Sequence, residues 1–317
     1  MSELPDGFSG KILALCGGVG GAKLAWGLAQ VLPPEQLVIA VNTGDDFEHL
    51  GLHISPDIDT VMYTLAGLNN RELGWGLQDE TWQCMQALET LGSETWFRLG
   101  DRDLATHLER SRLLARGVSL SEVTRQLCLQ LGVRHSVIPM SDDPVRTRVK
   151  TDIGELAFQD YFVRHQCGPR VSGVEFSGAK SAQMSAGLRA ALQDPDLGAV
   201  IVCPSNPLLS IAPILAVPGV RECLQSLAVP VIVVSPLVSG KAVKGPTAKM
   251  MAELAMPCDS GSIAAYYRDI AGVLVIDECD AAEANQPGFV VHACKTLMKT
   301  DADKRYLAEA LLGILST

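Results

Sequence analysis

The stretch KILALCGGVGGAKLAWGLAQVLPPEQLVIAVNT, residues 11–43, contains one complete structural unit. Residues 11–16 are a short apolar run that ends at glycines, and residues 22–32 carry apolar side chains at helical spacing. Two prolines stop that helix, and residues 37–43 form a second strand-like run. A strand, a helix and a strand in this order predict a βαβ unit with parallel strands and a right-handed crossover.

The rest of the chain continues this alternation. Helical segments interrupted by loops fill residues 60–135, and residues 145–165 alternate around a turn, which predicts an antiparallel hairpin. The later apolar runs AVIVC, VPVIVVSP and GVLVID predict further strands. We therefore expect an α/β fold: a Rossmann-like, doubly wound, mostly parallel sheet with a largely helical insertion and a β-hairpin. With no linker-like segment, residues 1–317 are expected to form a single large domain that contains this insertion.

The composition is that of an ordinary globular protein. The 317 residues are 47% hydrophobic and 20% charged, and the formal net charge is -10. Such an acidic surface repels a polyphosphate backbone, so we expect no nucleic-acid partner. Nine scattered cysteines without a CxxC pair argue against a zinc site and for a reducing compartment. Without a secretory or membrane-spanning pattern, we expect a cytoplasmic protein without membrane contact.

A glycine-rich loop, GGVGGAK at residues 17–23, lies between the first strand and the first helix. Glycines there allow the backbone to approach a phosphate, and the following helix N-terminus points N–H groups at an anion. The loop lacks the GK[ST] ending of a P-loop, and Lys23 stands where a dinucleotide fingerprint has its third glycine. The alternative is a turn that serves only the strand–helix connection.

Acidic residues gather after the second strand. Asp45 and Asp46 lie in NTGDDFEHLG, and Asp57 and Asp59 follow in SPDIDT. Strand ends of doubly wound sheets face the ligand crevice, and Mg²⁺ prefers hard oxygen ligands, so these four carboxylates are candidates for a magnesium site. The alternative for Asp57 or Asp59 alone is an N-cap that starts the next helix.

Three later segments also carry polar chemistry. LGDRDLATH, residues 99–107, combines two acids, an arginine and a histidine in what we expect to be a loop, although an arginine between acids is often only a structural ion pair. Residues 203–215 and 235–251 each follow a strand, on the side where a phosphate ligand is expected. The second of them holds glycines and Lys241, Lys244 and Lys249, and its alternative is a solvated basic loop.

Together and in this order, the motifs resemble the 2-phospho-L-lactate transferase family of coenzyme F-420 biosynthesis, including its phosphoenolpyruvate and 3-phosphoglycerate variants. The matching stretches are GGVGGAKLAWGL, VNTGDD, SPDIDTVMYTLAG, WGLQDET, RLGDRDLATH, PMSDDPVRT, FQDYFV, PSNPLLSI, SPLVSGKAVKGP and AYYRDIAGVLVIDECD. They cover nearly the whole chain, from residue 17 to about residue 280. Cys203 stands where the family more often has glycine, which can slightly reshape that loop.

The resemblance implies a reaction. A guanylyl-activated phospho-acid (phospholactate, phosphoenolpyruvate or 3-phosphoglycerate joined to GMP) donates its phospho-acid group to the terminal ribityl hydroxyl of the deazaflavin Fo, and GMP is released. Phosphoryl transfer depends on positioning and charge neutralisation, for which Mg²⁺ is the implied cofactor. The resemblance also suggests a homodimer.

Residue roles follow from the resemblance as expectations. Gly18, Gly20 and Gly21 would cradle the diphosphate, with Lys23 close to it. The catalytic and metal-binding candidates are Asp45 and Asp59, one of which would take the proton of the attacking hydroxyl, with Asp46 and Asp57 next. The donor would contact Ser205 and Asn206, under a loop with Lys244 and Gly245. The region expected to hold the flat deazaflavin comprises Thr60, Tyr63, Thr64 and Trp75.

Two other classes of protein compete with this reading. One is a non-catalytic, nucleotide-binding regulator of the related family, which would share the glycine loop but not SPDIDT and GDRDLATH. The other is a Rossmann oxidoreductase, against which the missing third glycine and the clustered aspartates count.

Overall fold

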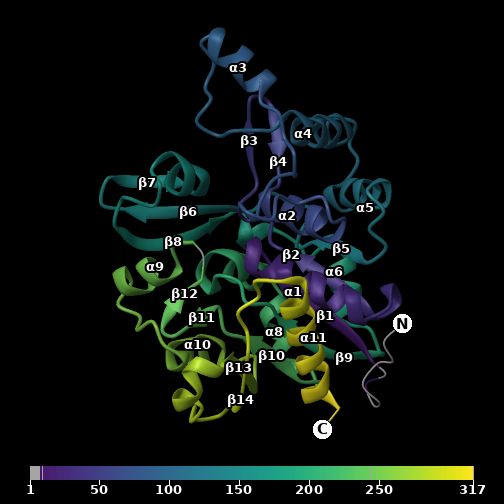
Figure 1. Cartoon of the computed structure of the whole chain (residues 1–317), viewed down its shortest axis with the longest axis vertical. Helices are drawn as coiled ribbons and strands as arrows, with labels where there is room; N and C mark the ends of the chain where they lie inside the picture. The colour runs from purple at the N-terminus through teal and green to yellow at the C-terminus, as the bar shows by residue number, and fades with distance from the viewer. Residues whose placement is uncertain (1–7, 9, 244, 317) are drawn as a thin grey trace.

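A seven-stranded parallel sheet forms the centre of the molecule (Figure 1). The computed structural model describes residues 8, 10–243 and 245–316. The strand order is β14–β13–β10–β9–β1–β2–β5. These strands are β1 (Lys11–Cys16), β2 (Leu37–Val41), β5 (Ser136–Pro139), β9 (Leu197–Val202), β10 (Val231–Val234), β13 (Val273–Asp277) and β14 (Val290–Cys294). The predicted doubly wound α/β fold is confirmed.

Helices cover both faces of the sheet because strand side chains alternate between two apolar cores. From β1, Ile12 and Ala14 enter one core and Leu13 and Leu15 the other. The first core is completed by α1 (Gly18–Val31), α2 (Pro56–Leu65), α5 (Leu120–Gln130) and α11 (Asp301–Leu315). The second is completed by α6 (Ala186–Leu192), α7 (Ala212–Ala216), α8 (Val220–Ser226) and α10 (Ser260–Tyr267).

None of the described helices is by itself long and apolar enough to cross a membrane. The segments Pro207–Ala216 and Val220–Ser226 reach that length and apolar character only when taken together, and they are bent by 88° relative to each other.

The strand order reverses between β1 and β9. From β1 the chain proceeds to β2 and β5 on one side, and then crosses to β9, β10, β13 and β14 on the other. Ligands of open α/β sheets bind at such a switch point, outside the carboxyl ends of the strands. The segments that follow β1 and β9 are the glycine loop and residues 203–206.

Smaller elements surround this edge of the sheet. The hairpin β3 (Phe47–His49) and β4 (Leu52–Ile54), with α3 (Gln83–Thr90), projects at the top of Figure 1, next to α4 (Asp101–Leu114). The predicted hairpin is present as β6 (Arg146–Thr151) and β7 (Gly154–Ala157), and an unpredicted third strand, β8 (Val171–Ser177), pairs with β6. Two further additions were not predicted, the hairpin β11 (Leu237–Val238) and β12 (Lys241–Ala242) and the helix α9 (Thr247–Glu253).

Two sequence-based boundaries differ from the structure. The helix expected from residue 60 begins at Pro56, because proline fits the first helical position after Ser55. LGDRDLATH is not a loop: Asp101, Asp103 and His107 lie on α4, whose first turn accepts the two acids next to the helix N-terminus.

Candidate active site

A cavity of about 640 Å³ opens at the switch point, within the usual size range of ligand pockets. The predicted residues that line it are Gly18, Gly20, Lys23, Asp45, Asp57, Asp59, Thr60, Tyr63, Trp75, Ser205, Asn206 and Gly245. Three predicted residues are buried without lining it, namely Gly21, Asp46 and Thr64. Lys244 lies outside the described residues. The fold thus brings most of the predicted residues to one space.

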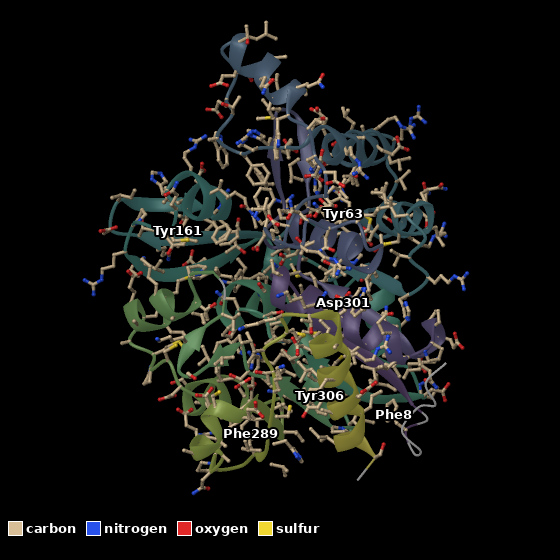
Figure 2. All side chains as sticks on the ribbon, viewed as in Figure 1. Phe8, Tyr63, Tyr161, Phe289, Asp301 and Tyr306 are labelled. Atoms are coloured by element: carbon tan, nitrogen blue, oxygen red, sulfur yellow. The ribbon has the colours of Figure 1, made fainter. Side chains whose placement is uncertain are left out.

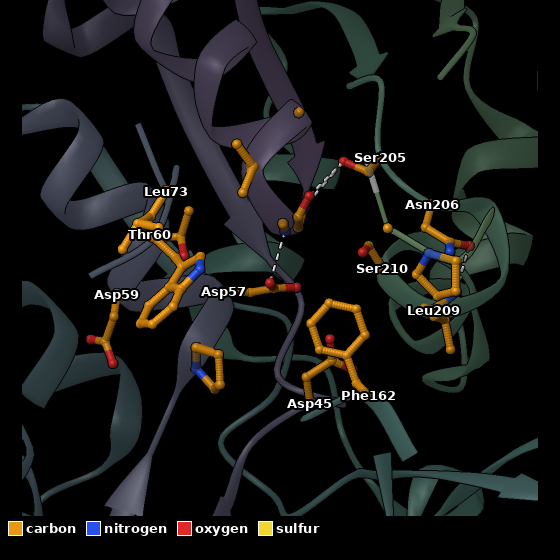
Figure 3. A pocket seen from close by; sticks show the side chains of 18 of the residues that line it. Asp45, Asp57, Asp59, Thr60, Leu73, Phe162, Ser205, Asn206, Leu209 and Ser210 are labelled. Carbon is orange, nitrogen blue, oxygen red and sulfur yellow. Dashed lines mark hydrogen bonds between the residues drawn. The ribbon is translucent and has the colours of Figure 1, made fainter. Parts of the chain in front are cut away.

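Hydrogen bonds join the loops after β1 and β9 in the wall of this cavity (Figure 3). The Gly17 backbone N–H donates to Ser205 Oγ (3.2 Å), and that hydroxyl donates to the Gly17 carbonyl (2.9 Å). A side chain on Gly20 would place its Cβ 2.2 Å from the Pro204 carbonyl oxygen, and one on Gly21 would lie 2.6 Å from Ser205 Oγ. These two glycines are therefore required by the contact between the loops, a role that the sequence analysis did not foresee.

We expect Gly20→Ala to lower the free energy of unfolding by about 1–3 kcal/mol, because the new methyl group meets backbone that cannot rotate away. Denaturant unfolding measures this. Gly313→Ala on α11 is the matched control, since among the described residues nothing beyond its chain neighbours and its own helix backbone lies within 4 Å of the added Cβ. It should leave stability unchanged or raise it by up to about 1 kcal/mol. Equal effects of the two substitutions would contradict the packing role of Gly20.

Asp57 binds the glycine loop. Its carboxylate accepts hydrogen bonds from the Gly18 backbone N–H (2.8 Å) and from Asn42 Nδ2 (2.9 Å). Ser55 is the N-cap residue of α2, so Asp57 lies in the first turn and is not the N-cap. Burial raises the pKa of Asp57 to about 6 despite these two hydrogen bonds. The residue therefore joins the switch-point loop to the start of α2.

Asp45 and Asp46 add two more buried carboxylates beside Asp57. Burial raises the pKa of Asp45 well above its usual range, and the charge of Asp57 raises it further, against a hydrogen bond from Thr147 Oγ1 at 3.4 Å. Asp46 accepts from Ser55 Oγ (2.8 Å), but its Oδ1 has no hydrogen-bond partner among the described residues. Buried carboxylates in such excess suit a divalent cation, which would favour their ionised forms.

The raised pKa of Asp57 predicts a pH-dependent stability in the metal-free protein. A carboxyl with a folded-state pKa of about 6, against 3.8 unfolded, contributes stability in full below pH 3.8 and loses it as the pH rises through 6. The difference in unfolding free energy between wild type and Asp57→Asn should therefore fall by about 3 kcal/mol from pH 3.5 to pH 7. Urea unfolding with chelator present measures it, and a difference that is flat with pH would contradict the assignment.

Asp59 points away from Asp57 (Figure 3) and meets a different partner. Arg110 on α4 binds it with both terminal nitrogens: Nη1 lies 3.0 Å from Oδ2, and Nη2 contacts Oδ1. Arg110 is fully buried. Burial alone lowers the pKa of Arg110, but the adjacent Asp59 carboxylate raises it above its usual value. Asp59 thus belongs to an ion pair in the wall of the cavity.

Arg110 was missed by the sequence analysis, although its spacing was a usable signal. Asp103, His107 and Arg110 are separated by four and three residues, which places them on one face of α4. Asp101 and Arg102 lie off this face: Asp101 accepts from the backbone N–H of Cys84 (3.0 Å), and Arg102 donates to the Gln78 carbonyl (2.8 Å). Within the motif, Asp103 and His107 therefore line the cavity, whereas Asp101 and Arg102 anchor the neighbouring loop.

On the opposite wall, Asn206 has an unused hydrogen-bond donor. Asn206 Oδ1 accepts from the backbone N–H groups of Leu208 (2.9 Å) and Leu209 (3.2 Å). Its Nδ2 is buried and has no hydrogen-bond partner in the part of the chain that the structure describes. Lys23 lines the cavity and donates to the Met298 carbonyl (2.8 Å). These donors suit an anionic ligand.

The mouth of the cavity is apolar and aromatic. The side chains that form it include Leu73, Trp75, Trp96, Phe97, Phe162 and Val243. Only Trp75 was predicted; the others come from loops and from the short helix Asp160–Arg164, where no periodic pattern marks a binding side chain. Of the three lysines in residues 235–251, Lys241 and Lys249 do not line the cavity.

A family model described as 2-phospho-L-lactate transferase CofD matches residues 12–308. The chain belongs to the 2-phospho-L-lactate transferase family. Relatives of this family include the 2-phospho-L-lactate transferase of Methanosarcina acetivorans, which is 38% identical over 96% of this chain and 99% of its own length. The phosphoenolpyruvate transferase of Streptomyces griseus is 39% identical over 92% of this chain and 94% of its own length.

Solved structures show the same fold at low sequence identity. A UPF0052 family protein of Bacillus halodurans superimposes with a TM-score of 0.60 and 15% identity, covering 96% of this chain and 100% of its own. At this identity the likeness concerns the fold alone. The transferase relatives, not this neighbour, therefore place the chain among enzymes.

Proposed function

We propose that this protein transfers a phospho-acid group from a guanylyl-diphosphate-type donor to the ribityl hydroxyl of the deazaflavin Fo and releases GMP. The acid is phospholactate, phosphoenolpyruvate or 3-phosphoglycerate. The observation that carries the proposal is a single cavity that joins the glycine loop, a set of buried carboxylates and an aromatic mouth. A phosphorylated donor and a flat acceptor need these three features side by side.

In the proposed step, the acceptor hydroxyl oxygen attacks the phosphorus that bears the acid. A new P–O bond forms, the P–O bond to GMP breaks, and the hydroxyl proton passes to Asp45 or Asp59, which both line the cavity. Gly18, Gly20 and Lys23 bind the diphosphate, and Ser205 and Asn206 hold the donor against them. Mg²⁺ would be held by Asp45, with Asp46 and Asp57 next, and would supply positive charge against the diphosphate. Asp59, the other metal-binding candidate from the sequence, is engaged through both carboxylate oxygens by Arg110 and is therefore not retained as a ligand.

Mass spectrometry of a reaction with Fo, Mg²⁺ and the three candidate donors tests the proposal. A phosphodiester of Fo together with GMP from one donor is the expected result and identifies that donor. Omitting Mg²⁺ should abolish product formation. Absence of Fo binding, measured by fluorescence quenching, would overturn the proposal and favour a nucleotide-binding regulator. From the family resemblance we also propose a cytoplasmic homodimer, which light scattering of the purified protein checks for its oligomeric state.

A further inference from the structure

One wall of the cavity is built from facing side chains of α2 and α4. Tyr63 on α2 lies inside the upper half of the molecule (Figure 2) and donates its hydroxyl to Asp103 Oδ1 on α4 (2.7 Å). Tyr63, Asp103 and His107 all line the cavity. The Tyr63 bond occupies one carboxylate oxygen, and Asp103 Oδ2 faces His107 at 3.3 Å from its Nε2.

Arg110 determines which nitrogen of His107 carries the proton. Arg110 Nη1 lies 3.2 Å from His107 Nδ1, and a guanidinium can only donate, so Nδ1 accepts and the ring proton is on Nε2. His107 is 2% exposed, yet its Nε2 has no hydrogen-bond partner among the described residues, because the approach to Asp103 lacks hydrogen-bond geometry. A buried donor left in this way is unfavourable unless a ligand satisfies it.

Asp59, Asp103 and His107 also have the spacing of a metal site, with ligand atoms within 4.8 Å of one another. Arg110, however, already occupies both carboxylate oxygens of Asp59 and brings a positive charge to the cluster. A cation would be repelled there. The charge of Arg110 does not repel a neutral ligand group that both donates and accepts hydrogen bonds.

We infer that His107 Nε2 and Asp103 Oδ2 form a hydroxyl-binding pair that recognises a substrate polyol. An alcohol accepts from Nε2–H and donates to the carboxylate, so one hydroxyl satisfies both groups. This inference rests on the proposed function, whose substrates offer two such polyols: the ribose of the guanylyl donor and the ribityl chain of Fo. The sequence did not lead us to expect that Asp103 and His107 bind a substrate hydroxyl.

Binding measurements on Asp103→Asn separate the two sources. GMP binding is measured by calorimetry and Fo binding by fluorescence, both with Mg²⁺ present, and thermal melting checks the fold. Loss of a hydrogen bond to a charged group should lower the affinity for one of the two ligands by about 10- to 100-fold. The affinity for the other should stay within about twofold of wild type. Weaker GMP binding identifies the ribose, and weaker Fo binding identifies the ribityl chain.

His107→Leu gives a second measurement that does not depend on the fold of the first variant. Loss of Nε2 should lower the affinity for the same ligand whose binding is weakened by Asp103→Asn. Glu109→Gln is the control, since Glu109 is on the same helix but is exposed and paired with Arg112. If wild type binds both ligands and neither variant changes either affinity, the hydroxyl-binding pair is wrong and the proposed function stands. If wild type binds neither GMP nor Fo, the hydroxyl-binding pair and the proposed function are both wrong.

Discussion

Arg110→Met should lower the free energy of unfolding by about 3–5 kcal/mol, because it leaves the buried Asp59 carboxylate without its counter-ion. Methionine keeps much of the volume of the side chain, so the loss reports the missing charge rather than a large cavity. Denaturant unfolding at neutral pH measures the effect. Activity should fall as well, since Asp59 lines the cavity.

Two further variants identify the cause of this loss. Arg112→Met removes an exposed arginine from the same helix, where the ion pair with Glu109 contributes less than about 1 kcal/mol. The double variant Asp59→Asn with Arg110→Met removes both charges and should recover part of the stability. A loss below about 1 kcal/mol in Arg110→Met, or no recovery in the double variant, would count against the buried ion pair as a stabilising contact.

The second large effect is expected for Asp45→Asn, which should reduce the transfer rate by about 10³-fold. An amide neither takes the hydroxyl proton nor supplies the charge that a divalent cation requires. Stability should be unchanged or slightly higher, because burial and the nearby Asp57 raise the pKa of Asp45 and so disfavour its ionised form in the metal-free protein. Steady-state rates across a Mg²⁺ titration, together with urea unfolding, measure both quantities.

Glu48→Gln is the matched control for Asp45→Asn. Glu48 is an exposed carboxylate three residues further along the chain and does not line the main cavity. Its rate should stay within about twofold of wild type. An Asp45→Asn enzyme that retains more than about a tenth of the wild-type rate would show that Asp45 is neither the proton acceptor nor a needed metal ligand.

The amino-acid sequence by itself determined most of the sheet and the edge at which the cavity opens. Apolar runs of strand length, helical spacing and the glycines after β1 are local patterns, and each is visible within about ten residues. The strand β14 and the third strand β8 were missed because neither has a clean alternating apolar pattern, and both are stabilised by pairing with partners elsewhere in the chain.

Only the tertiary structure decided which side chains meet. Asp57 binds the glycine loop 39 residues before it, Ser205 closes on Gly17 across 188 residues, and Arg110 reaches Asp59 across 51. Sequence reasoning grouped the four aspartates as one set, whereas the fold divides them between the glycine loop and α4. Local propensity determines where a helix begins, but the partner of a buried charge depends on how distant elements pack, and no local pattern records that.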